Sequence, residues 1–273
     1  MTRAILLGAT GIAVAFGMLA FGYLAGQPRG AIAEDIPSPA VSSATPGTLD
    51  RKEVELIVRD YLLANPEILL EVQQALETKQ QEEQRISQLG IIKDAKEEIF
   101  NSSFDGVMGN PNGKVTIVEF YDYNCGYCKR AMADMHALIE ADPEVRFVLK
   151  EFPILGPDSQ RAHIVSQAFQ KLMPEKYAEF HTQMLGSQGR AGEESAVKLA
   201  VSLGADEAKL RETMKDPTIT ETFARTYDLA NRLAITGTPS YVVGNEVVFG
   251  ALGKDVLAEK ITAAKACIDD ASC

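Results

Sequence analysis

The chain has 273 residues, of which 46% are hydrophobic and 24% are charged. This balance excludes a largely disordered chain and a protein that crosses a membrane many times. The formal net charge of -11 opposes contact with a phosphate backbone, so a nucleic-acid partner is excluded. With roughly 150 residues per domain as a guide, the length indicates one large domain and a smaller unit.

The first predicted element is an uncharged apolar segment over residues 4–25. At about 1.5 Å per helical residue this segment is about 33 Å long, which is enough to span a bilayer. Residues 31–33 form a small-x-small pattern that a signal peptidase accepts. We therefore predict that residues 1–33 are a signal peptide or a membrane anchor. In both cases the acidic remainder of the chain is predicted to lie in an oxidising compartment, the periplasm.

Residues 34–103 are predicted to separate this segment from the main domain. Residues 34–49 hold three prolines among Ser, Ala and Thr, so we expect a disordered linker. Residues 50–103 are predicted to form helices, with Asn65 and Pro66 ending one helix and starting the next. The predicted apolar stripes comprise Val54, Ile57, Val58 and Tyr61, then Ile68, Leu69, Val72 and Leu76.

Two short helices cannot bury such stripes by themselves, so the segment 50–103 is predicted to be an oligomerisation stalk. The polar run 77–85 interrupts the apolar seam, which argues against a long uniform coiled coil. Folding of these helices back onto the main domain is the alternative.

Residues 104–273 have the pattern of a mixed α/β domain. Apolar runs at 115–120 and 145–149 predict strands that are buried on both faces. Residues 159–233 have a helical period, and two apolar triplets flank Gly244 and Asn245 as in a hairpin. The predicted order is therefore strand, helix, strand, helical block, hairpin and closing helix.

Cys125 and Cys128 follow the first core strand and begin a stretch compatible with a helix. Cysteines three residues apart in a first helical turn lie on one side, and the first faces the positive end of the helix dipole. A thiolate there is stabilised, so Cys125 is the predicted attacking sulfur and Cys128 the resolving sulfur. Half of a zinc site is a disfavoured alternative, because the other cysteines lie far along the chain with a different spacing.

Glu119, Cys267 and Cys273 are the other single residues with a predicted role. Glu119 interrupts an apolar run six residues before Cys125, so we expect a buried carboxyl with a raised pKa that exchanges a proton with Cys128 through water. A strand-end carboxylate facing solvent is the alternative.

Cys267 and Cys273 are predicted to form a structural disulfide, with a second redox couple or a metal-binding thiol pair as the alternative. No metal site and no cofactor is predicted.

Two stretches carry a resemblance to a known family. Residues 119–129, EFYDYNCGYCK, together with residues 237–240, GTPS, resemble the DsbA-like branch of the thioredoxin superfamily. The resemblance covers about residues 104–273. It implies a thioredoxin fold with a helical insertion between the CxxC helix and the cis-Pro strand, preceded by the N-terminal helical stalk. It also implies a cis bond before Pro239, and a substrate-binding set comprising Thr238, Pro239, Gly126 and Tyr127.

Residues 61–76 resemble the N-terminal region of the suppressor-of-copper-sensitivity C proteins, which are periplasmic disulfide isomerases or reductases, some of them trimeric. This resemblance implies a thiol-disulfide oxidoreductase that acts on protein disulfides or thiols, with a membrane redox partner and self-association through the stalk. Gly126 and Tyr127 between the cysteines, with Thr238 before Pro239, favour an isomerase or reductase. The alternatives are a DsbA-type dithiol oxidase and a copper-sequestering or chaperone-like binding protein.

Overall fold

The computed structural model of the chain describes residues 50–269. Two compact units divide at Ala64 and Asn65. The predicted membrane or signal segment 1–33, the predicted linker 34–49 and Cys273 lie outside the described residues. Across residues 50–269, no helix is long and apolar enough to cross a membrane.

The described part of the first unit is the helix α2 (Arg51–Ala64), which buries none of its residues. It ends immediately before Asn65 and Pro66, as predicted. Its exposed large apolar side chains are Val54, Leu56, Ile57, Val58, Tyr61 and Leu63. A single helix has no core in which such side chains could be buried.

The second unit begins with α3 (Glu67–Asp94), a single helix of 28 residues. The polar run 77–85 interrupts its apolar stripe but not the helix. Ion pairs between Lys79 and Glu83 and between Arg85 and Glu82 support this stretch at helical spacing. Every residue from 69 to 87 is exposed, so the first part of α3 buries no side chain against the described residues of this unit.

The last turns of α3 and the short helix α4 (Lys96–Phe100) pack on the α/β domain. Ile92 and Ile99 belong to one of its two apolar cores. Gln88 is buried and donates a hydrogen bond to the carbonyl oxygen of Leu233 at 2.8 Å. Residues 88–100, which the sequence assigned to the stalk 50–103, therefore share their packing with the domain that was predicted to begin at residue 104.

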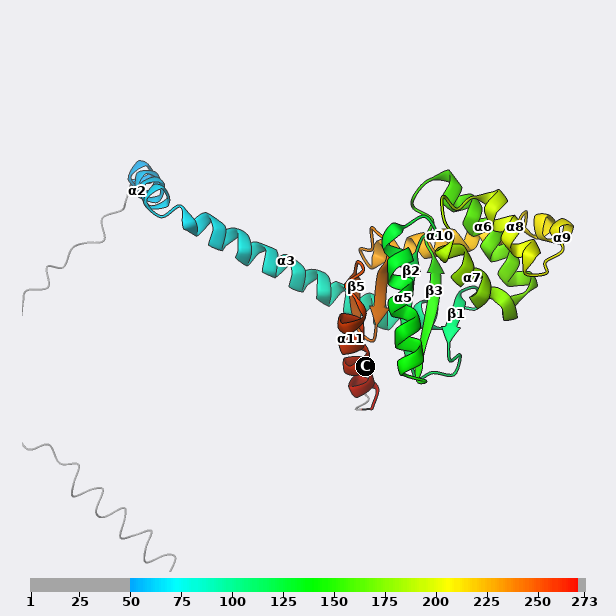
Figure 1. Ribbon diagram of the computed structural model, residues 1–273. Coiled ribbons are helices and arrows are strands. Elements are labelled where there is room, and N and C mark those ends of the chain that lie inside the picture. Colours follow the sequence, from blue (N-terminus) through cyan, green and yellow to red (C-terminus); the bar gives the residue numbers. More distant parts are fainter. Residues whose placement is uncertain (1–49, 270–273) are drawn as a thin grey trace, which may run out of the picture. The chain divides into compact units, whose positions relative to one another are not determined.

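A mixed five-stranded sheet forms the centre of the domain (Figure 1). The strand order is β1-β3-β2-β4-β5; only β2 and β3 pair in parallel, and the other neighbours are antiparallel. The strands are β1 (Gly106–Gly109), β2 (Val115–Tyr121), β3 (Val145–Glu151), β4 (Ser240–Val243) and β5 (Glu246–Phe249). The edge strand β1 was not predicted, because four residues with a glycine at each end carry no readable alternation.

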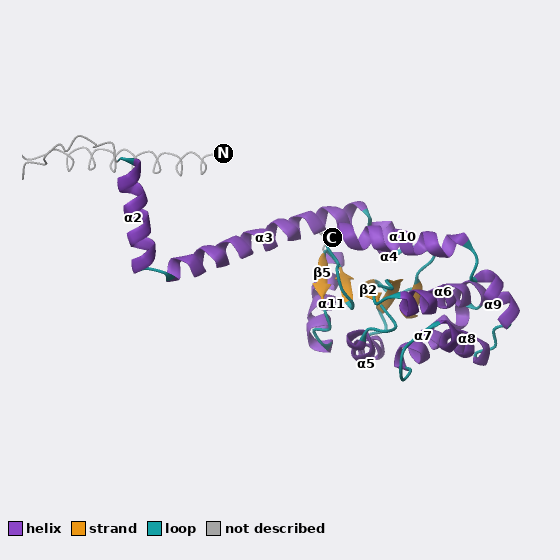
Figure 2. Ribbon diagram, turned by 90° about the horizontal axis from the view of Figure 1, so that it is seen from above, coloured by secondary structure: helices purple, strands orange, loops and turns teal. Residues whose placement is uncertain are grey.

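Helices cover both faces of the sheet (Figure 2). The cysteine helix α5 (Gly126–Ala141) and α11 (Lys254–Asp269) lie on one face, while the end of α3, α4 and α10 (Pro217–Arg232) lie on the other. The insertion between β3 and β4 comprises α6 (Pro157–Leu172), a 3-10 turn (Pro174–Lys176), α7 (Tyr177–Gly186), α8 (Glu193–Ser202), α9 (Glu207–Thr213) and α10 (Pro217–Arg232). The predicted α/β domain with a helical insertion before the hairpin is confirmed.

Alternate residues of β2 enter the two cores. Ile117 and Tyr121 face the core beneath α5, whereas Val118 and Phe120 face the core beneath α10. Glu119 lies between them on the side of Ile117 and Tyr121. The central strand therefore carries one carboxyl group towards the helix that begins with the cysteines.

Candidate active site

Cys125 and Cys128 lie where the central strand β2 gives way to α5. Cys125 is the N-cap residue of α5, in an extended backbone conformation, and its N–H donates to the carbonyl oxygen of Asp122 at 2.9 Å. Cys125 retains 6% exposure and Cys128 none, and both are free thiols. Cys125 thus keeps a small exposed area, while Cys128 is fully enclosed.

The two thiols differ strongly in acidity. The pKa of Cys125 is lowered from 9 to about 5, chiefly by a hydrogen bond from the Cys128 thiol; burial opposes this, and contacts with Thr238 and the first backbone N–H groups of α5 add to it. Burial raises the pKa of Cys128 far above its usual range, and Cys125 and Glu119 raise it further. At neutral pH the outer sulfur is therefore a thiolate and the inner one a thiol.

The peptide bond between Thr238 and Pro239 is cis, as predicted. The Cys125 thiol donates to the carbonyl oxygen of Thr238 at 3.1 Å. Antiparallel pairing of β4 with β2 brings this turn to the cysteines although 113 residues separate the two along the chain. The backbone of Gly250 donates to the Pro239 carbonyl oxygen at 2.9 Å and holds the turn from its other side.

Glu119 is 1% exposed and pairs in register with Tyr241 of β4. Burial, followed by repulsion from the Cys125 thiolate, raises its pKa from 4.5 to about 8. One carboxyl oxygen, Oε2, is buried without a hydrogen-bond partner among the described residues. The prediction of a buried carboxyl with a raised pKa is confirmed, and the alternative of a carboxylate facing solvent is wrong.

Replacing Glu119 by Gln should slow by about 100-fold the step in which Cys128 displaces a substrate sulfur that is disulfide-bonded to Cys125, because the carboxylate predicted to accept the Cys128 proton is gone. In the wild type the release rate should rise with pH through about 8, where Glu119 ionises, and in Glu119→Gln that step should vanish. Stopped-flow release from a preformed mixed disulfide between pH 6 and 9 measures both. Identical pH profiles would remove Glu119 from proton transfer.

The raised pKa of Glu119 also affects how the stability of the folded protein depends on pH, which urea unfolding of the same two proteins measures. A carboxyl whose pKa is raised in the folded state stabilises the fold below its unfolded value of about 4.5, and this stabilisation is lost as the pH rises through about 8. As the pH rises from about 4.5 to about 8, the free energy of unfolding should therefore fall in the wild type but not in Glu119→Gln, so the difference between the two should shift in favour of the variant.

Asp122 holds the loop in front of Cys125, a role that the sequence analysis missed. It is fully buried, and its Oδ1 accepts hydrogen bonds from the backbone N–H of Asn124 and from the hydroxyl of Ser159, each at 2.8 Å. Its Oδ2 accepts from the N–H of Leu155 at 2.9 Å. A carboxylate three residues before the CxxC motif was the only available signal, because Ser159 and Leu155 lie more than 30 residues further along the chain.

A buried histidine supports the same loop. His163 accepts a hydrogen bond at Nε2 from the backbone N–H of Tyr123 at 3.2 Å, and its Nδ1 lies 2.8 Å from Glu151 Oε2. Glu151 also accepts from Ser166 at 2.6 Å and from Tyr177 at 3.1 Å. His163 therefore holds the backbone two residues before Cys125, a role for which its place in a predicted helical stretch gave no signal.

The remaining predicted pair is only partly described. Cys267 is disulfide-bonded, whereas Cys273 lies outside the described residues, so the pairing of the two stays a prediction. Within residues 50–269, no three His, Cys, Asp or Glu side chains are grouped as a metal site.

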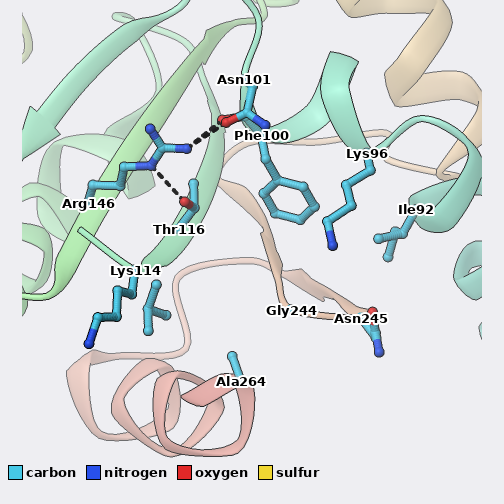
Figure 3. A pocket seen from close by; sticks show the side chains of 11 residues that line it. Ile92, Lys96, Phe100, Asn101, Lys114, Thr116, Arg146, Gly244, Asn245 and Ala264 are labelled. Carbon is cyan, nitrogen blue, oxygen red and sulfur yellow. Dashed lines mark hydrogen bonds between the residues drawn. The ribbon is translucent and has the colours of Figure 1, made fainter. Parts of the chain in front are cut away.

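A cavity of about 290 Å³ lies at the beginning of β2, whereas the cysteines follow the end of this strand. Figure 3 shows the side chains that line the cavity. It is lined by Val115, the first residue of β2, and by Phe100, Lys114 and Arg146 among others. The Arg146 guanidinium already donates to Thr116 and Asn101, and Lys114 forms an ion pair with Glu144. The polar groups of this cavity are thus largely engaged within the protein, and the cavity has no part in the cysteine chemistry.

Comparisons with known proteins agree with this geometry. The model of the DSBA-like thioredoxin domain matches residues 116–262, more than half of the chain, and that of the copper resistance protein ScsC N-terminal domain matches residues 50–83. The chain is 28% identical over 165 residues to disulfide bond formation protein D of Bacillus subtilis, covering 57% of this chain and 74% of that protein.

Two solved structures extend the likeness. A thioredoxin-like oxidoreductase from Silicibacter pomeroyi is 39% identical, with a TM-score of 0.59 over 62% of this chain and 97% of its own. A linker-deletion mutant of Proteus mirabilis ScsC is 25% identical, with a TM-score of 0.62 over 82% of this chain and 99% of its own. The chain therefore belongs to the DSBA-like thioredoxin family and is a thiol-disulfide oxidoreductase of the DsbA and ScsC type.

Proposed function

We propose that this protein is a periplasmic disulfide isomerase or reductase in which Cys125 attacks disulfides of other proteins. The observation that carries the proposal is one arrangement: an acidic, slightly exposed Cys125 beside the cis Thr238–Pro239 turn, with a buried and much less acidic Cys128 behind it. The uncharged segment 4–25 supports the location, since it is suited to export or anchoring.

The first step is an exchange of sulfur bonds. The Cys125 thiolate attacks one sulfur of a substrate disulfide, a new S–S bond forms, and the second substrate sulfur leaves as a thiolate. When Cys125 is protonated, its thiol donates a hydrogen bond to the carbonyl oxygen of Thr238. Ionisation removes that donor, so the carbonyl becomes available to the backbone N–H of an extended substrate at the moment when the nucleophile forms.

The second step has two outcomes. In reduction, Cys128 passes its proton to the Glu119 carboxylate and attacks the Cys125 sulfur; the bond between Cys125 and the substrate breaks, and the substrate sulfur leaves as a thiolate. The substrate has then gained two electrons, and the enzyme is left as the Cys125–Cys128 disulfide. In isomerisation, another thiol of the substrate attacks the mixed disulfide instead, and the enzyme returns to its dithiol form with no net transfer of electrons. The burial of Cys128 favours the second route, because a hindered resolving thiol leaves time for rearrangement.

Exposed apolar side chains around Cys125 support a polypeptide substrate. Tyr127 is 60% exposed in the first turn of α5. Leu155 is exposed and its backbone is bonded to Asp122, while Leu252 is exposed and follows the Gly250 that holds Pro239. Apolar groups gathered at a reactive site bind unfolded or flexible protein segments better than they bind small polar thiols.

Replacing Cys128 by Ala tests the proposal. The variant should accumulate covalent complexes with disulfide-containing proteins, because the attacking thiolate remains while the resolving sulfur is gone. Non-reducing electrophoresis after incubation with scrambled ribonuclease should show the adduct, and dithiothreitol should dissolve it. The double variant Cys125→Ala/Cys128→Ala is the control. Absence of adducts, with peptide binding retained, would instead indicate a chaperone-like binding protein.

The lowered pKa of Cys125 also favours a second candidate, the dithiol oxidase. Stabilising the thiolate stabilises the reduced enzyme, which makes the disulfide form a stronger oxidant. The reduction potential of the Cys125–Cys128 couple against glutathione separates the two functions when combined with refolding of reduced and of scrambled substrate. Faster refolding of reduced substrate alone would favour the oxidase.

The exposed apolar side chains of α2 and of the first part of α3 support self-association, which we include in the proposal. Replacing both Leu69 and Leu76 by Asp should lower the molar mass of the protein in solution to that of one chain. These two positions are seven residues apart on one helical face, and both are exposed in the single chain.

Multi-angle light scattering measures this change. The control replaces Gln80 and Gln84 by Asp, since both glutamines are exposed on α3 and the added charge is the same. A mass unchanged by the leucine substitutions would contradict a stalk, and a mass lowered equally by the control would assign the effect to charge.

A further inference from the structure

Two side chains that flank the cysteines reach across to one segment of the helical insertion. The segment comprises residues 187–191, between α7 and α8, and is called the rim segment below. Asn124 precedes Cys125 and Lys129 follows Cys128. The chemistry derived above uses neither residue, although both are polar and partly buried beside the nucleophile.

Asn124 grips the end of the rim segment in both directions. Its Nδ2 donates to the carbonyl oxygen of Ala191 at 2.9 Å, and its Oδ1 accepts from the N–H of Ala191 at 2.7 Å. The same Nδ2 also donates to the hydroxyl of Ser159, which is bonded to Asp122. A carboxamide donates through its nitrogen and accepts through its oxygen at the same time, so it matches both the C=O and the N–H of Ala191.

Lys129 grips the beginning of the rim segment. Its Nζ donates to the carbonyl oxygens of Ser187 at 2.8 Å and of Gly189 at 3.4 Å. Hydrogen bonds from a charged donor are stronger than neutral ones, and here no carboxylate of the described residues shares the ammonium group. Both ends of the rim segment are therefore fixed to the first turn of the cysteine helix and the residue before it.

The middle of the rim segment is exposed and joined to the other side of the site. Gln188, Gly189 and Arg190 are exposed, and Gly189 has a φ of +82°. Arg190 forms an ion pair with Asp158 at 2.6 Å and donates to the carbonyl oxygen of Leu155 at 3.3 Å. The rim segment thus connects α5 to the exposed Leu155, which belongs to the surface argued above to receive polypeptide.

We propose that Asn124 and Lys129 are positioning residues that hold the rim segment as a wall of the polypeptide-binding site. This inference rests on the proposed function and deepens it, because it names residues that set affinity for protein substrates. A five-residue segment with a left-handed glycine samples many conformations when it is released, and a substrate must then order it on binding. The hydrogen bonds from Asn124 and Lys129 order the rim segment before the substrate binds, so this entropic cost does not fall on binding. The sulfur chemistry of Cys125 does not depend on these hydrogen bonds.

The test is a comparison of substrates of two sizes on the full-length protein. In Lys129→Met, the KM for reduction of a disulfide-containing protein such as insulin should rise by about tenfold with kcat nearly unchanged, since the wall is misplaced and the nucleophile is not. The rate of reaction with oxidised glutathione should change by less than about twofold. Lys129→Arg, which keeps a charged donor, should restore most of the affinity.

Two further measurements separate positioning from mere structural support. Hydrogen exchange at residues 187–191 should accelerate in both Lys129→Met and Asn124→Ala, and the double variant should raise KM by less than the product of the single effects, because both act through one segment. Lys198→Met, at an exposed lysine of α8, is the charge-matched control and should leave KM unchanged.

The outcomes distinguish this inference from the proposed function. Faster exchange at 187–191 with an unchanged KM would overturn the positioning role, and so would equal losses with insulin and glutathione. If the wild type itself fails to reduce or rearrange any protein disulfide, the proposed function fails first, whatever the variants show. If the wild type is active and all variants match it, only the inference fails.

Discussion

Replacing Cys125 by Ser should abolish disulfide exchange, with a fall in rate of about a thousandfold or more, because the hydroxyl that replaces the thiolate is not ionised at neutral pH. The rate of insulin reduction in the presence of glutathione measures the loss. Cys267→Ser is an unsuitable control, since Cys267 is disulfide-bonded. Ser240→Ala, at the start of β4, alters a buried hydroxyl near the site and should retain exchange activity.

The lowered pKa of Cys125 can be measured directly from the pH dependence of its alkylation. Alkylation of the reduced wild type should be half-maximal near pH 5 rather than near 9, and this midpoint should rise in Cys128→Ala, which lacks the hydrogen bond that contributes most to the lowered pKa. A thiol whose pKa is lowered in the folded state stabilises the fold above its unfolded value, and that stabilisation is lost as the pH falls from 9 through 5. An alkylation midpoint near 9 would contradict the proposed nucleophile.

Replacing Lys150 by Met should destabilise the protein by about 3–5 kcal/mol, because it leaves Asp105 buried without its partner. Lys150 and Asp105 form an ion pair with side chains that are 1% and 2% exposed, and Lys150 also donates to the Glu98 carbonyl oxygen at 2.8 Å. Urea unfolding followed by circular dichroism measures the loss. The pair joins β3 to the segment that connects α4 to β1, so the variant also reports on how firmly α4 is held to the sheet.

The pH dependence and a double variant identify the cause. Burial outweighs the attraction of Lys150 and raises the pKa of Asp105 to about 6, so its stabilising contribution is present below about 3.8 and is lost as the pH rises through 6. Without Lys150 the pKa rises further, and the loss of stability should therefore be greater at pH 8 than at pH 5. Lys150→Met/Asp105→Leu should recover most of the stability, since no buried charge remains. Equal losses in the single and double variants would contradict an unpaired charge as the cause.

Local patterns were sufficient for the main elements. The apolar run at 115–120 predicted β2 because a strand covered on both faces needs apolar side chains in both directions, and Asn65–Pro66 marked the boundary between α2 and α3 because proline fits only the first turn of a helix. The edge strand β1 and the attachment of residues 88–100 to the domain were not readable. Both depend on which surface is available to pack against, and a local pattern does not contain that surface.

The sequence by itself determined that two cysteines begin a helix after a core strand, that a carboxyl lies behind them and that a Thr-Pro turn precedes a hairpin, since strand, helix and turn preferences act over a few residues. Only the tertiary structure decided which groups meet. The partners of the site come from separate parts of the chain: Thr238 beside Cys125, Asp122 bonded to Ser159 and Leu155, and the rim segment held by Asn124 and Lys129. Such contacts follow from strand pairing and from the packing of the insertion, in which residues far apart in sequence exclude water together.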